Sequence, residues 1–275
     1  MFSVLCLSAG GKNESHLKIA ATIFPLSDIA GQISSGTQTQ VVTILPAGAN
    51  PHTFELSPRT IKELEGTRIV FVIGRGFDDW IKAVAESLPL AQAVAVDRGI
   101  DFIKPGSEDP HYWLSITNAK IVAKNIAHKL AELEPHNKNR YEANLARYLS
   151  QLDEVDQNIR NLLSNLRARK IMTFHNGWQY FAREYGFEIV GTVEPSLGGE
   201  PTPKRLAHLD DLIREHQIKV LFSEPAVSKA VAESVAKDFN VRLFELDPIG
   251  GSSGADFLDL MKANAEVVHE ALSYG

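Results

Sequence analysis

The chain has 275 residues and a formal net charge of −6, with 44% hydrophobic and 23% charged residues. These values are typical of a globular protein that has one large core or two smaller ones. The acidic net charge argues against a nucleic-acid-binding protein, because it indicates no basic face for phosphates. No apolar run reaches the roughly 20 residues that a membrane-spanning helix requires.

The only cysteine, Cys6, lies in the N-terminal segment MFSVLCLSAGG. The rest of the chain can therefore form neither disulfides nor thiolate metal sites. The segment is similar to part of a secretion signal, although it lacks a basic start and its apolar run is short. Lipid attachment at Cys6 stays an open alternative, since Leu5 is larger than the residue that such sites favour.

Short apolar strands alternate with amphipathic helices in the first half of the chain. The pattern predicts strands over 18–24, 40–45, 68–73 and 93–97. It predicts helices over 27–35, 57–66, 79–88 and 115–133. Ser57 and Pro58 are typical of a helix start, and Gly66 is typical of a helix end.

A long helix is predicted over 135–169, where neither Gly nor Pro occurs after Pro135. At about 1.5 Å per residue, such a helix is as long as a small domain is wide. Its apolar residues alternate in steps of four and three and therefore share one stripe: Tyr141, Leu145, Tyr148, Leu152, Val155, Ile159, Leu162 and Leu166. The helix is interpreted either as a rigid strut between two lobes or as an ordinary packing helix within one domain.

The second half repeats the alternation, with strands predicted over 170–174, 188–193, 220–223 and 241–246. Helices are predicted over 178–185, 203–216, 228–239 and 257–272. This order indicates an α/β protein with two lobes, each with a parallel sheet flanked by helices. The predicted parts are a residual signal or disordered N-terminus (1–16), an N-terminal lobe (17–134), the linking helix (135–169) and a C-terminal lobe (170–275).

Polar residues at the carboxyl ends of the predicted strands form a candidate metal site, because ligands bind at these ends of parallel sheets. His52 and His111 follow strands of the first lobe, whereas His175 and Asp247 follow strands of the second. Three imidazoles and a carboxylate suit Zn²⁺ and complete a tetrahedral shell. A single loop histidine is more often a surface residue, so the prediction depends on four residues at equivalent positions.

Other polar residues near these positions are given supporting roles. Glu55 and Asp109 neighbour His52 and His111, and they are interpreted as groups that orient a ligand or cap a loop. Glu200 is expected to face the N-terminus of the next helix. Glu224 caps a strand of the second lobe without being one of the predicted ligands.

Six motifs around these residues occur in order across the chain. They are AGANPHTFELSP around His52, DPHYWLS around His111, TFHNGWQYFAREYG around His175, EPTP from Glu200, FSEP around Glu224 and LDPIGG around Asp247. With these motifs, the sequence resembles the solute-binding proteins of ATP-driven zinc and manganese importers from about Lys18 to its end. The resemblance implies two α/β lobes joined by a long helix, with one metal ion between them. It also implies the ligands His52, His111, His175 and Asp247.

Two departures from the family pattern bear on the metal. Many zinc-selective members carry a long His- and Asp-rich loop where this chain has only KPGSE, so a scavenging role of that loop is not expected. Manganese-selective members usually have a carboxylate at the position of His175. Three imidazoles and one carboxylate fit Zn²⁺ better than the harder Mn²⁺, although relatives with this ligand set are expected to bind both.

The resemblance implies a monomeric zinc receptor that is periplasmic or otherwise extracytoplasmic, and that is lipid-anchored if Cys6 is modified. Such a receptor is not an enzyme; it delivers Zn²⁺ to the membrane permease of an ABC importer. A manganese-preferring or dual-metal receptor is the first alternative. A zinc-dependent hydrolase is the second, and it would keep one coordination position open for water.

Overall fold

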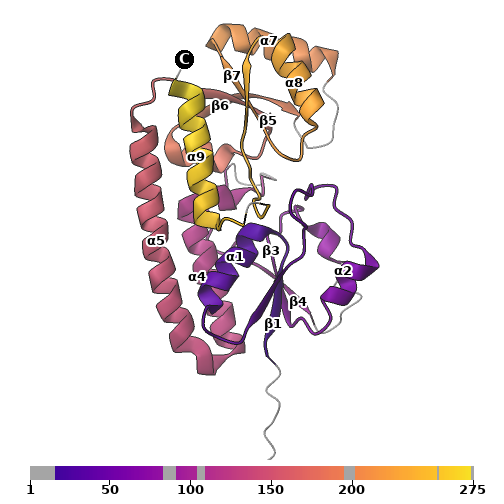
Figure 1. Cartoon of the computed structure of the whole chain (residues 1–275), viewed down its shortest axis with the longest axis vertical. Helices are drawn as coiled ribbons and strands as arrows, with labels where there is room; N and C mark the ends of the chain where they lie inside the picture. Colours follow the sequence, from indigo (N-terminus) through magenta and orange to yellow (C-terminus); the bar gives the residue numbers. More distant parts are fainter. Residues whose placement is uncertain (1–15, 83–90, 104–108, 195–201, 253, 274–275) are drawn as a thin grey trace, which may run out of the picture.

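Two four-stranded parallel sheets form the centres of two lobes (Figure 1). The computed structural model describes residues 16–82, 91–103, 109–194, 202–252 and 254–273. The sheet orders are β2-β1-β3-β4 in the N-terminal lobe and β6-β5-β7-β8 in the C-terminal lobe. The predicted fold class, two parallel-sheet lobes joined by a long helix, is confirmed.

The strands begin at or next to the predicted residues, and several end earlier than predicted. Their bounds are β1 Lys18–Ala21, β2 Gln40–Thr43, β3 Ile69–Val72, β4 Gln92–Ala95, β5 Lys170–His175, β6 Glu188–Glu194, β7 Val220–Ser223 and β8 Arg242–Glu245. The inner strands β3 and β7 are buried at every position, whereas β2, β4 and β8 at the sheet edges are partly exposed. This pattern fits parallel sheets with helices on both faces.

The helices are α1 Phe24–Ser34, α2 Pro58–Glu63, α4 Ile116–Leu133, α5 Lys138–Ser164, α6 Gln179–Tyr185, α7 Pro203–His216, α8 Lys229–Asp238 and α9 Phe257–Ser273. Single 3₁₀ turns occupy η1 Asp79–Ile81, η2 Tyr112–Leu114 and η3 Pro135–Asn137. Of the predicted helix over 79–88, residues 83–88 lie outside the described part. None of the described helices combines the length and the apolar character needed to cross a membrane.

The long helix α5 has 27 residues and begins after the separate turn η3, later than predicted. It ends at Ser164, where the Arg169 side chain donates to the carbonyls of Leu163 and Ser164 at 2.9 and 3.0 Å. These bonds satisfy carbonyls that a helix end leaves without an intrahelical partner. Its buried stripe includes Tyr141, Asn144, Tyr148, Leu152, Val155, Ile159 and Leu163.

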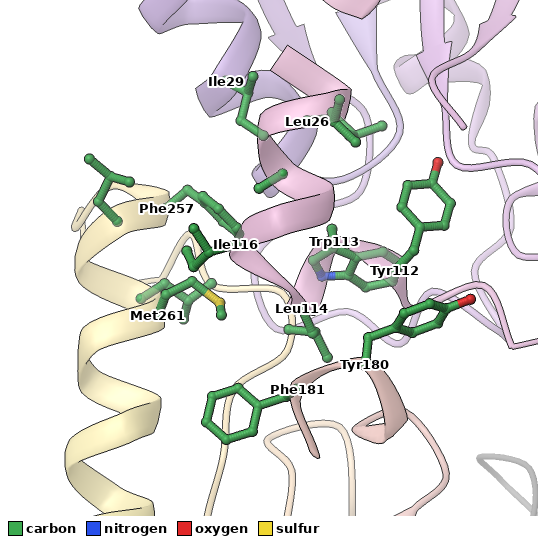
Figure 2. Close-up of a cluster of buried hydrophobic side chains, with 14 of the residues drawn as sticks. Leu26, Ile29, Tyr112, Trp113, Leu114, Ile116, Tyr180, Phe181, Phe257 and Met261 are labelled. Carbon is green, nitrogen blue, oxygen red and sulfur yellow. The ribbon is translucent and has the colours of Figure 1, made fainter. Parts of the chain in front are cut away.

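One hydrophobic core runs through both lobes between the two sheets. α5 packs on α1 and α4 of the N-terminal lobe and on α9 of the C-terminal lobe (Figure 1). Figure 2 shows Trp113, Leu114 and Ile116 among side chains of α1, α6 and α9. Smaller clusters cover the outer face of each sheet. The long helix thus acts as the predicted strut, while the residue boundaries of the lobes stay a prediction.

Asn144 is a polar member of the buried stripe of α5. Its side-chain amide donates to the backbone carbonyls of Ile33 and Ser35, both at 2.8 Å, at the end of α1. A buried carbonyl that loses its hydrogen-bond donor is left desolvated without a partner, which destabilises the folded state.

We therefore expect Asn144→Ala to lower the free energy of unfolding by about 1–3 kcal/mol relative to Asn158→Ala on the exposed face of the same helix. Urea denaturation of both variants measures this difference; equal stabilities would contradict it.

Asp28 links α1 to the start of α9, because its carboxylate accepts the N–H of Phe257 at 3.2 Å. Burial raises the pKa of Asp28 from 3.8 to about 6, and the Asp256 carboxylate adds to this rise, whereas the Phe257 N–H opposes it. The folded protein therefore holds this proton more tightly than the unfolded chain does. As a result, the contribution of Asp28 to stability falls as the pH rises from about 4 to 6.

We expect Asp28→Asn to stabilise the protein above pH 6.5 by on the order of 1–3 kcal/mol, with no gain near pH 4. The amide oxygen of Asn can still accept the Phe257 N–H, so the substitution removes mainly the charge. Urea denaturation at several pH values measures the effect. Asp211→Asn on the exposed face of α7 is the control, and a gain that is equal at all pH values would contradict the expectation.

Candidate metal centre

The candidate site lies between the lobes, at the carboxyl ends of both sheets. In each sheet the chain reverses its direction of winding between two adjacent strands, β1 and β3 in the first sheet and β5 and β7 in the second. Open α/β sheets bind ligands at such positions. Loops after β2, β3 and β4 form one wall of a cavity, and segments after β5, β7 and β8 form the other. The cavity has a volume of about 40 Å³, which is room for an ion with a few water molecules.

Three histidines from the two lobes meet in this cavity. One ring nitrogen of each lies within 4.8 Å of those of the other two. Their ring centroids are 5.5 Å apart for His52 and His111, 5.3 Å for His52 and His175, and 4.9 Å for His111 and His175. The structure therefore brings together the three histidines that the sequence placed at separate strand ends.

His52 lies in the loop between β2 and α2 and is the most exposed of the three rings. Its backbone N–H donates to the Asn50 side chain at 2.9 Å, which closes a tight turn. The indole of Trp80 donates to the Pro51 carbonyl at 3.2 Å. These two bonds hold a loop that has no regular secondary structure of its own.

His111 is held by the hydrophobic core, because the turn η2 follows it directly and is fully buried. The Tyr112 hydroxyl donates to the Ile73 carbonyl at 2.9 Å, at the end of β3. The Trp113 indole donates to the Pro248 carbonyl at 2.8 Å and so connects the two lobes. Figure 2 shows both aromatic rings within the core. The position of His111 is thus fixed against both lobes.

His175 is the last residue of β5 and is buried. Gly177 allows its ring to lie close to His111. A Cβ atom at Gly177 would lie 3.0 Å from the His175 Nδ1 and 3.2 Å from the His111 Cδ2. In the sequence, the HNGW run at the end of the predicted strand indicates His175 as a site residue. The closeness of Gly177 to His111 is visible only in the tertiary structure.

Phe77 was not among the predicted site residues, although it follows β3 at the same sheet edge. Its ring packs edge-on against His52 and His111 at centroid distances of 5.1 and 5.6 Å. The next residue, Asp78, holds the loop by accepting the backbone N–H groups of Ile73 and Gly74 at 2.6 and 2.9 Å. Phe77 therefore forms an apolar wall that limits how the two imidazoles can rotate.

Asp247, the fourth predicted ligand, lines the same cavity but does not belong to the described group of close ligand atoms. Its Oδ1 accepts the backbone N–H groups of Ile249 and Gly250 at 3.0 and 2.8 Å. Local hydrogen bonds thus engage one of its carboxylate oxygens. Whether Asp247 binds the ion stays a prediction.

Two further carboxylates lie next to the histidine rings. Asp109 approaches the His111 Nδ1 at 2.9 Å and accepts its backbone N–H at 3.0 Å. Glu224 lies 3.4 Å from the His175 Nδ1. The predicted orienting role thus fits the position of Asp109, whereas Glu55 is exposed and Glu200 lies outside the described residues.

Loss of solvent around two of the imidazole rings favours their neutral form. His52 is exposed as a residue, but its ring faces the other two histidines and is partly desolvated there. This desolvation lowers the pKa of His52 from 6.5 to about 3, with smaller contributions from His111 and His175. Burial also lowers the pKa of His111, although its contact with Asp109 opposes the shift. These two imidazoles are therefore neutral at pH 7, which is the form that donates a lone pair to a metal.

The arrangement fits a divalent metal ion of borderline softness. Three imidazole nitrogens about a tetrahedral Zn²⁺ lie about 3.3 Å from one another, given Zn–N bonds of about 2.0–2.1 Å. Small side-chain rotations would bring the three rings from their present separation to that distance. Oxygen donors are also available, because Asp247 and Glu224 line the same cavity.

Comparison with known proteins agrees with this geometry. The family model described as "Zinc-uptake complex component A periplasmic" matches residues 19–271. The manganese ABC transporter substrate-binding lipoprotein PsaA of Streptococcus mitis is 30% identical over 98% of this chain and 95% of its own. The high-affinity zinc uptake system protein ZnuA of Bacillus subtilis is 26% identical over 96% and 90%.

The same relationship holds for the fold. A crystal structure of ZnuA superposes with a TM-score of 0.85 at 30% identity, covering 94% of this chain and 99% of that one. The family consists of binding proteins and not enzymes, so the hydrolase alternative is set aside. The chain belongs to the periplasmic component A family of zinc-uptake complexes, the extracytoplasmic metal-binding proteins of ABC importers.

Proposed function

We propose that this protein captures Zn²⁺ outside the cytoplasm and delivers it to the membrane permease of an ABC importer. The observation that carries the proposal is the cluster of three imidazoles within 4.8 Å of one another, contributed by both lobes. Nitrogen ligands favour Zn²⁺ over Mn²⁺, which prefers oxygen. Asp247 is proposed as the fourth ligand, because it lines the cavity beside the histidines.

Release of the ion is proposed to occur without a wide hinge movement. α5 has neither Gly nor Pro, and it packs against helices of both lobes. A continuous helix absorbs little bending, so the lobes can rotate only slightly about it. We propose that the loop that carries His52 is the part that moves, because His52 is the exposed member of the three histidines. Its displacement by the permease would remove one ligand and weaken the binding of the ion.

A receptor for both Zn²⁺ and Mn²⁺ is the second candidate function. PsaA, named for manganese, and ZnuA, named for zinc, are both similar to this chain. The carboxylates of Glu224 and Asp247 line the cavity and could supply oxygen ligands for the harder ion.

We expect His111→Ala and His175→Ala each to lower Zn²⁺ affinity by about 100-fold or more, because each removes a nitrogen ligand from a preformed cluster. Competition with a chromogenic chelator measures the affinity. Circular dichroism checks that the fold survives. His208→Ala, on the exposed side of α7, is the matched control and should leave the affinity unchanged. Unchanged affinity in both site variants would overturn the site and the proposed function.

Asp247→Ala tests the fourth ligand and the metal preference together. If Asp247 supplies an oxygen, its loss should lower Mn²⁺ affinity more than Zn²⁺ affinity, because Mn²⁺ depends more on oxygen donors. We expect the wild-type protein to bind one Zn²⁺, which Mn²⁺ displaces only in large excess. Calorimetric titration with each ion measures these values. Unchanged affinity for both ions would exclude Asp247 as a ligand, and equal affinities in the wild type would favour the dual-metal receptor.

A further inference from the structure

We propose that Glu224 is a positioning residue of the metal site, whose carboxylate accepts a hydrogen bond from the Nδ1–H of His175 and thereby directs Nε2 toward the ion. This inference rests on the proposed metal-binding function. It assigns a role to a carboxylate that lies at the end of β7 and lines the cavity.

Glu224 and His175 are buried beside each other, and each has a polar side-chain atom that makes no hydrogen bond to a described residue. The His175 Nδ1 and the Glu224 Oε2 are both buried, and neither has a hydrogen-bond partner among the residues that the structure describes. The Nδ1 atom lies 3.4 Å from the other carboxylate oxygen, Oε1, and the two side chains are 5% and 1% exposed. Because a buried polar atom without a partner is costly, a small rotation that completes this bond is favourable.

Two neighbours determine where the pair can move. The Trp178 indole donates to the Glu224 Oε1 at 2.8 Å and holds the carboxylate in place. Gly177 provides room for the imidazole, since a Cβ there would lie 3.0 Å from Nδ1. The anchored carboxylate and the free space beside the ring leave His175 as the group that moves. Turning its Nδ1–H toward Glu224 would present the Nε2 lone pair to the cavity.

The first lobe contains the same arrangement in completed form. The Asp109 carboxylate lies 2.9 Å from the His111 Nδ1, and both side chains are 6% exposed. A carboxylate on the remote nitrogen fixes the tautomer of a metal-binding histidine and increases its basicity. Glu224 would supply to the second lobe what Asp109 supplies to the first.

The experiment is a double-mutant cycle on Zn²⁺ affinity. Glu224→Ala should lower the affinity about 10–100-fold, and Glu224→Gln, whose amide oxygen can still accept a hydrogen bond from Nδ1–H, should lower it less. In a His175→Ala background, Glu224→Ala should have little further effect, since its target is absent. In a His111→Ala background it should keep its full effect, which makes this cycle the matched control.

A direct readout of the tautomer accompanies the affinities. The ¹⁵N–¹H spectrum of the wild-type protein should show His175 protonated at Nδ1, and Glu224→Gln should preserve that signal while Glu224→Ala shifts it toward a mixture. Trp178→Phe separates the roles of Glu224, because it removes the anchor but leaves the carboxylate. It should cost less affinity than Glu224→Ala does.

Failure of this inference differs from failure of the proposed function. If His175→Ala lowers the affinity but Glu224→Ala does not, the positioning role is wrong and the metal site stands. If Glu224→Ala lowers Zn²⁺ affinity equally with and without His175, the positioning role is also wrong. If Glu224→Gln lowers Zn²⁺ affinity as much as His175→Ala does, Glu224 is a direct ligand and not a positioning residue. If His175→Ala and His111→Ala both leave Zn²⁺ binding intact, the proposed site itself fails.

Discussion

The separation of three imidazole rings that belong to two different lobes depends on the hydrophobic core between the sheets. His111 is followed by a buried aromatic turn in this core, and His175 ends a buried strand that leads into α6. The Trp113 indole connects the segment after His111 to Pro248 in the other lobe. Close packing of this kind resists compression and extension, so the distance between the rings is a property of the whole core.

The surroundings of the rings also favour the neutral form of two of the three imidazoles. The surroundings that hold the rings in place also lower the pKa of His52 and His111, because a charged imidazole is poorly solvated there. A neutral imidazole keeps one N–H and offers a lone pair on the other ring nitrogen, so these two rings are ready to bind a cation. The carboxylates of Asp109 and Glu224 lie beside two of the rings, where their charge would favour a bound divalent ion.

The long helix α5 was predicted from the spacing of its apolar residues, and its role as a strut follows from what it contacts. Its stripe packs on α1 and α4 from one lobe and on α9 from the other. The predicted and observed stripes differ at the C-terminal end, where Leu163 is more deeply buried than Leu162. Asn144, which a search for apolar residues overlooks, is buried because its amide satisfies the carbonyls at the end of α1.

The sequence by itself determined the order of strands and helices and the residues that follow each strand, since both depend on local periodicity and capping. It thereby indicated His52, His111, His175 and Asp247 as a group before any distance was known. The structure brings ring nitrogens of the three histidines within 4.8 Å of one another, and the role of Asp247 stays a prediction. Only the tertiary structure decided that Phe77 packs against His52 and His111, that Gly177 lies close to His111 and His175, and that an Asp247 oxygen accepts backbone N–H groups. Side-chain directions across a shared cavity depend on packing between lobes and on competing hydrogen bonds, and neither leaves a periodic signal in the sequence.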